Sequence, residues 1–106
     1  MQIGLLHPHY SEDHLVEVAE KMKKLGAPKI RAIWSECYGM WMAVEGCHRI
    51  RAAKSLGLIP VIVDVSSQKY VRIQLEENNV RVAVATLEEE LTNDLPRTEI
   101  ISFDEE

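Results

Sequence analysis

The sequence has few cysteines and no long apolar run, and we expect no secretory signal. Its two cysteines, Cys37 and Cys47, are too few to form a disulfide scaffold. No apolar stretch approaches the roughly 18 residues that a membrane span needs, and the opening residues MQIGLLHP show no basic region ahead of an apolar one. We therefore expect a cytoplasmic protein that does not act at a membrane.

An excess of positive charge is also missing. The net charge is −5 and the pI is about 5.4. Residues 1–75 carry ten Lys/Arg and seven Asp/Glu, whereas residues 76–106 carry two and ten. A protein that grips a DNA duplex unaided usually has a basic stripe and a high pI, so direct DNA binding by the isolated chain is disfavoured. The balance in the first part still allows a local basic pocket for a small anion.

The length of 106 residues, with 46% hydrophobic and 27% charged residues, is typical of one globular domain. A short apolar run at 3–6 predicts a first strand, which Pro8 ends. Ser11 is a good N-cap and Gly26 a good C-cap for the helix that follows. The apolar residues of that helix recur at three- and four-residue spacing: Leu15, Val18, Ala19, Met22 and Leu25.

The middle of the chain alternates between strand and helix patterns. Strands are predicted over 29–34 and 40–44, a short helix over 47–56, and a buried strand over 59–65. Gly57 closes the short helix. This order predicts an α/β (α+β) domain.

Residues 70–84 fit two different structures. Apolar residues alternate on both sides of 76–79, which slightly favours a hairpin: Val71, Ile73, Leu75, Val80, Val82 and Val84. Alternatively, Ser67 can cap a helix that ends near Asn79. The periodicity alone leaves both structures open.

The last part of the chain is acidic. Thr86 can cap a second short helix, and the residues beyond Pro96 contain only one small apolar group, Ile100, Ile101 and Phe103. We therefore expect a domain over 1–95 and an acidic C-terminal tail over 96–106.

The turn between the strand at 40–44 and the following helix is the best candidate for chemistry. Gly46 allows a ligand to approach the backbone, and the first amides of a helix attract anions. Arg49 and Arg51 supply guanidinium groups that suit phosphate oxygens, and His48 is a further donor. Cys47 begins the helix beside these cations, a position that favours a reactive thiolate. The pattern predicts anion binding, with or without a nucleophilic sulfur.

The run GCHRIRAAKSLGLIPVIV, residues 46–63, resembles the signature of ParB-like domains. This resemblance implies a small mixed sheet with flanking helices and a pocket for a nucleoside triphosphate, typically CTP. The sequence ENNVR resembles the family's second phosphate motif, which implies a phosphate-binding role for Glu77, Asn78 and Arg81. In the family this motif closes a helix, so we follow the resemblance and expect a helix over 67–79.

The same turn, Gly-Cys-His-Arg at 46–49, is similar to that of sulfiredoxins, which share this fold. In those enzymes the cysteine attacks an activated sulfinic acid while the His and Arg hold ATP phosphates. The arginine and lysine that add phosphate contacts in sulfiredoxins correspond here to His7 and His14. Because an unperturbed His is mostly uncharged at neutral pH, histidines at these two positions predict weaker binding of a triphosphate than in sulfiredoxins.

Three functions follow, in order of preference. The first is a ParB-like nucleotide-phosphate-binding domain, an NTPase or a regulatory module, that uses Mg²⁺ with ATP or CTP and acts with a protein partner. The second is a sulfiredoxin-like, ATP-dependent sulfinic-acid reductase in which Cys47 is the nucleophile. The third is a non-catalytic interaction module or a ParB-like, nuclease-type protein associated with DNA. The histidines and cysteines match no standard zinc spacing, so no protein-bound metal site is expected.

Overall fold

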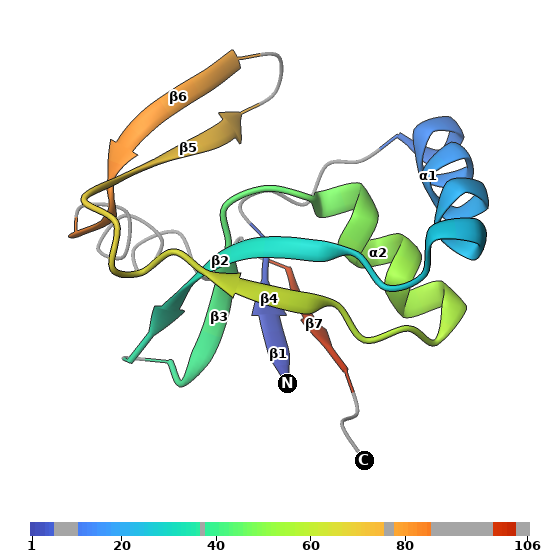
Figure 1. Ribbon diagram of the computed structural model, residues 1–106, viewed down its shortest axis with the longest axis horizontal. Helices are drawn as coiled ribbons and strands as arrows, with labels where there is room; N and C mark the ends of the chain where they lie inside the picture. Colours follow the sequence, from blue (N-terminus) through green and yellow to red (C-terminus); the bar gives the residue numbers. More distant parts are fainter. Residues whose placement is uncertain (6–10, 37, 76–77, 86–98, 104–106) are drawn as a thin grey trace.

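A computed structural model describes residues 1–5, 11–36, 38–75, 78–85 and 99–103. Its centre is a five-stranded sheet with the strand order β4-β2-β3-β1-β7 (Figure 1). The strands are β1 (Gln2–Gly4), β2 (Lys29–Ser35), β3 (Met40–Ala43), β4 (Val61–Asp64) and β7 (Ile100–Ser102). β1 is parallel to β3 and β2 to β4, whereas the β2–β3 and β1–β7 pairs are antiparallel. The predicted mixed sheet is therefore confirmed.

Two helices form where the sequence predicts them. In α1 (Glu12–Leu25), the Ser11 hydroxyl accepts a hydrogen bond from the His14 N–H at 3.4 Å, and the Gly26 N–H closes the helix on a carbonyl of its last turn. α2 (Cys47–Leu56) ends at Gly57, whose φ of 70° lies in the left-handed region that glycine adopts without strain. Both boundaries agree with the expected caps.

Residues 70–83 form a hairpin, not a helix. β5 (Tyr70–Leu75) pairs with β6 (Asn78–Ala83) in a separate two-stranded sheet, with Val71 opposite Val82 (Figure 1). The helix over 67–79 that the family resemblance implied is wrong, and the hairpin favoured by the alternation is confirmed. The physical reason is the side-chain period: a strand puts Val71 and Ile73 on one face, whereas a helix separates two such residues by about 200°.

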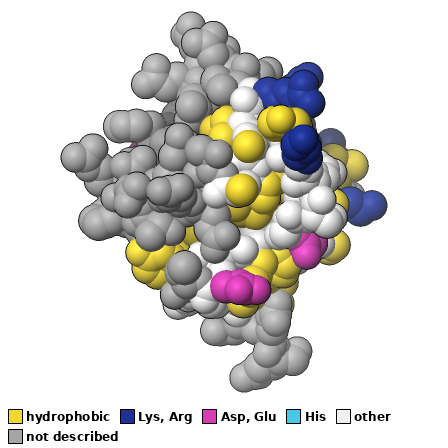
Figure 2. Space-filling view, turned by 90° about the vertical axis from the view of Figure 1, so that its left-hand side faces the viewer, with side chains coloured by type: hydrophobic (Ala, Val, Ile, Leu, Met, Phe, Trp, Pro, Cys, Tyr) yellow, Lys and Arg dark blue, Asp and Glu magenta, His cyan; other side chains and the backbone are white. Residues whose placement is uncertain are grey.

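The hairpin packs against the main sheet through two buried residues. Val71 and Ile73 lie in a cluster with Ile33, Met40 and Met42 of the sheet and with Val44 and Val65, which directly follow β3 and β4. On the opposite face, Tyr70, Arg72 and Arg81 are exposed among the residues whose side chains the structure describes. In the view that faces this side of the molecule, the lysine and arginine side chains gather toward the upper right and the acidic ones lie below them (Figure 2).

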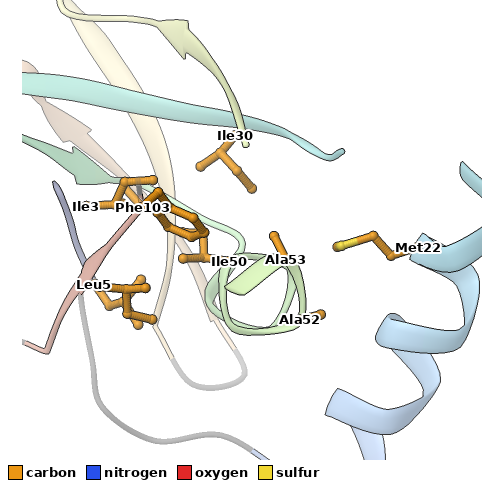
Figure 3. Close-up of a cluster of buried hydrophobic side chains, with 10 residues drawn as sticks. Ile3, Leu5, Met22, Ile30, Ile50, Ala52, Ala53 and Phe103 are labelled. Carbon is orange, nitrogen blue, oxygen red and sulfur yellow. The ribbon is translucent and has the colours of Figure 1, made fainter. Parts of the chain in front are cut away.

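The other side of the sheet is covered by α2, and α1 packs against α2. Ile50 of α2 points toward Ile3 and Phe103 of the sheet, and Met22 of α1 points toward Ala53 (Figure 3). Ala52 and Ala53 are fully buried, so small side chains let the two helices approach. This packing fixes α2, and with it the Gly46 turn, against the sheet.

Residues 100–103, part of the segment expected to be an acidic tail, lie in and beside the main sheet. β7 pairs with β1, and Ile101 and Phe103 are buried in the main core. The Phe103 N–H donates to the Met1 carbonyl at 2.8 Å, which extends the pairing. The apolar group embedded in the acidic segment supplies an edge strand. The helix expected after Thr86 lies outside the described residues.

Neither α1 nor α2, the helices of the described residues, is long and apolar enough to cross a bilayer.

Candidate functional site

The turn between β3 and α2 requires glycine for two reasons. Gly46 has a φ of 82°, in the left-handed region. A Cβ at this position would lie 2.8 Å from Cδ1 of Ile30 and 3.3 Å from a terminal nitrogen of Arg49. The backbone at the start of α2 is thus pressed against β2, and Arg49 lies over it.

Three charged side chains form a network beside this turn. Arg31 of β2 donates two hydrogen bonds to Glu45, from Nε to Oε1 at 3.0 Å and from Nη2 to Oε2 at 2.9 Å. Arg49 donates from Nη2 to Oε1 of the same carboxylate at 3.3 Å, and from Nη1 to the Lys29 carbonyl at 3.0 Å. One carboxylate therefore holds two guanidinium groups, and the network carries a net charge of about +1 when all three groups are ionised.

These contacts change the proton affinities of the groups involved. The hydrogen bonds from Arg31 lower the pKa of Glu45, burial opposes this shift, and the charge of Arg49 adds to it. The hydrogen bond to Glu45 in turn raises the pKa of Arg31, again against the effect of burial. Glu45 stays an anion to lower pH than an ordinary glutamate.

Arg51 lies on a different side of α2 and has a different partner. Two residues along a helix are about 200° apart, so Arg49 and Arg51 cannot point the same way. Arg51 donates from Nη1 to Glu99 at 3.0 Å and from Nη2 to the second oxygen of that carboxylate. The Glu99 hydrogen bond raises the pKa of Arg51, burial opposes it, and the adjacent Cys47 thiol adds to it. With a side chain only 11% exposed, Arg51 ties α2 to the segment that leads into β7.

His48 joins the first turns of the two helices. Its Nε2 accepts a hydrogen bond from the Ser11 N–H at 3.0 Å, and its ring meets that of His14 edge to face with centroids 4.5 Å apart. The accepting nitrogen must be unprotonated, so this contact uses His48 as an acceptor and not as a cation. His14 also lies 3.6 Å from the Glu17 carboxylate. The predicted pocket residue His14 is thus brought beside the Gly46 turn, whereas His7 lies outside the described residues.

Cys47 is the first residue of α2 and is half-buried against the main core. Arg51 lies four residues further along α2, about one helical turn away, and Cys47 adds to the upward shift of the Arg51 pKa. The thiol is thus at a helix N-terminus, one turn from an arginine.

A strand, a glycine turn, a helix that carries two arginines and a further strand follow one another in the order that the resemblance implied. A family model of the ParB N-terminal domain matches residues 6–79, which is most of the chain. The chain belongs to the ParB N-terminal domain family. No curated protein and no solved structure matches the chain.

Of the second motif of this ParB N-terminal domain, the structure describes the side chain of Arg81, which lies on the hairpin and not at the Gly46 turn. Glu77 lies outside the described residues, and Asn78 begins β6. Arg81 lies over the ring of Tyr70, 4.5 Å from its centroid, and directly opposite Arg72 in the hairpin register. That face of the hairpin points away from the sheet, and α2 lies on the sheet's other side. The family match ends at residue 79, before Arg81.

In the part of the ParB N-terminal domain that the structure describes, no cluster of side chains forms an Mg²⁺ site. No group of three or more His, Cys, Asp or Glu side chains could hold a metal ion among those residues. Glu45, the carboxylate beside the turn, is already bonded to two arginines. The described residues therefore do not fit a protein-held metal.

Sequence reasoning missed three members of this neighbourhood: Arg31, Glu45 and Glu99. Glu45 directly precedes Gly46, and Arg31 alternates with the buried residues of β2, so both carried a local signal. Glu99 lies 48 residues from Arg51, and no local pattern connects them.

Proposed function

We propose that this ParB N-terminal domain binds the phosphate chain of a nucleoside triphosphate, ATP or CTP, at the N-terminus of α2. The observation that carries the proposal is the Gly46 turn, which opens a helix on a left-handed glycine beside the Arg31 and Arg49 guanidinium groups. The family membership supports the same function, because the resemblance implies a nucleotide pocket at this turn.

The charges of the two helices differ in a way that favours an anion at α2. α1 carries Glu12 and Asp13 in its first turn, where they offset the positive end of the helix dipole. The first turn of α2 has no acidic residue. A phosphate at this position gains from the dipole and from the net positive network around Glu45.

Titration calorimetry with ATP and CTP, with and without Mg²⁺, tests the proposal. Arg49→Gln is expected to weaken nucleotide binding about tenfold or more, the effect of one charge-assisted hydrogen bond. Lys24→Gln removes the same charge from the exposed last turn of α1 and should change affinity little. Absence of binding at millimolar nucleotide overturns the proposal. Because the described residues hold no metal site, we expect Mg²⁺ to act through the phosphates.

The position of Cys47 beside Arg51 favours one second candidate, the sulfiredoxin-like reduction of a sulfinic acid with ATP. Cys47→Ser should leave nucleotide affinity unchanged under the binding-domain proposal and abolish turnover under this one. A domain that binds nucleotide without any turnover would be the regulatory module of the first proposal. As an NTPase, a regulatory module or a reductase, the domain would act together with a protein partner.

A further inference from the structure

The two arginines that contact Glu45 are held unequally. Arg31 makes a two-point contact, with both carboxylate oxygens engaged at 3.0 and 2.9 Å. Arg49 makes one longer contact, at 3.3 Å, and its other bond goes to a backbone carbonyl. Parallel two-point pairs are the stronger and more geometrically defined form of this interaction.

This difference determines which hydrogen bond to Glu45 breaks when an anion binds. Glu45 is tied to Arg31, whereas Arg49 has only single hydrogen bonds to release. The Arg49 side chain is 40% exposed and lies across the backbone of Gly46. A phosphate at the mouth of α2 can therefore attract Arg49 without breaking the Arg31–Glu45 pair.

We propose that Glu45 is an internal competitor for the ligand: it occupies Arg49 in the free domain, and the nucleotide's phosphate chain takes Arg49 from it. This inference rests on the proposed function and adds its regulation. Glu45 remains on Arg31 in the bound state, so the site keeps a carboxylate next to the phosphates. The competition favours ligands with several phosphate charges, such as a di- or triphosphate, over anions with a single charge.

The first consequence concerns affinity. Removal of the competing charge should strengthen binding of ATP, CTP and inorganic triphosphate by about three- to tenfold, a moderate effect because the contact is partly exposed. Glu45→Gln keeps the size of the side chain and removes its charge. Glu20→Gln is the matched control, since Glu20 pairs with Lys23 on the exposed side of α1 and contributes the same charge.

A double-mutant cycle tests the role of Arg31. Arg31→Gln leaves Glu45 with Arg49 as its remaining arginine, so this variant should bind nucleotide more weakly than the wild type. Adding Glu45→Gln should then restore affinity to at least the wild-type level, because the double variant has the same network charge as the wild type and an Arg49 that no carboxylate occupies. A double variant that binds more weakly than the wild type would instead make Arg31 a direct ligand and overturn its role as the holder of Glu45.

Arginine side-chain NMR on the unmodified chain gives a second readout that does not depend on any variant folding. Nucleotide should shift the Arg49 Nε–H resonance strongly and leave that of Arg31 nearly unchanged. Equal shifts of both resonances, or a shift of Arg31 alone, would contradict the proposed exchange.

The outcomes separate this inference from the proposed function. If the wild type binds nucleotide and Glu45→Gln binds equally or more weakly, the competition is refuted and the binding site stands. If the wild type binds nucleotide and Glu45→Gln binds it more tightly while Glu20→Gln does not, the competition is supported. If neither chain binds any nucleotide or inorganic triphosphate, the proposed function itself is overturned.

Discussion

Replacement of Gly46 by alanine tests the geometry of the candidate site most directly. The substitution places an L residue at a φ of 82°, which costs about 1–2 kcal/mol. It also adds a Cβ 2.8 Å from Cδ1 of Ile30, well inside the ordinary carbon–carbon contact of about 3.5–4.0 Å. Ile30 is fully buried, so moving its side chain should cost about a further 1–3 kcal/mol. The total loss of unfolding free energy is therefore about 2–5 kcal/mol.

Thermal unfolding followed by circular dichroism measures this loss. For a domain of this size, each kcal/mol lowers Tm by about 4–8 °C, so Gly46→Ala should unfold at least about 8 °C below the wild type. Gly57→Ala is the matched control: Gly57 has a φ of 70°, and a Cβ there meets nothing within 4 Å. The control should show only the conformational part of the loss.

The difference between the two alanine variants isolates the contact with Ile30. Ile30→Val removes the Cδ1 atom that the new Cβ would meet. In the Gly46→Ala background this change should cost less than it does in the wild type, by about 1 kcal/mol or more. If Gly46→Ala is no more destabilising than Gly57→Ala, or if Ile30→Val shows no coupling, the close approach of α2 to β2 is wrong.

Three further predictions concern stability. The Arg51 hydrogen bonds lower the pKa of Glu99. This pair therefore stabilises the fold above the unfolded-state pKa of about 4.3 and loses its contribution as pH falls through the lower folded pKa. A Tm profile from pH 7 to 3 should be flatter for Glu99→Gln than for the wild type, and an identical profile would refute the link. Ser11→Ala removes an exposed N-cap contact and should lower the free energy of unfolding, measured by urea titration, by about 0.5–1 kcal/mol. An unchanged free energy would mean that the hydrogen bond to His48 alone holds this turn. Ile73→Ala should cost about 2–4 kcal/mol, whereas Arg72→Ala on the exposed face should cost less than about 0.5; equal losses would contradict the hairpin.

Local patterns were enough to predict most of the fold. The caps Ser11, Gly26 and Gly57 placed both ends of α1 and the end of α2, because each satisfies a local backbone requirement that needs no tertiary information. The alternation over 70–84 likewise indicated the hairpin. The resemblance led to a helix there because a family's usual element was given more weight than the side-chain period of this chain.

The candidate site was predicted less completely, and the reason is its long-range pairing. Gly46 could be identified as the turn because a glycine before a helix start is a local signal. The partners of Arg49 and Arg51 could not be identified, because Lys29 and Glu99 meet them only after the sheet has formed. Two arginines in one helix turn suggested a common target, whereas helical geometry sends them to opposite sides.

The pairing of β1 with β7 has a consequence for how the domain folds. Gln2 lies opposite Ser102, so these partners are separated by almost the whole chain, and β1's other neighbour, β3, is also distant in sequence. Such non-local contacts require a large entropic loss before they yield any stabilisation, which slows folding. The helices and the β5–β6 hairpin can form early, but the core around Ile3 and Leu5 is incomplete until β1 has paired with β3 and β7. The domain should therefore be most prone to aggregate before these pairs form.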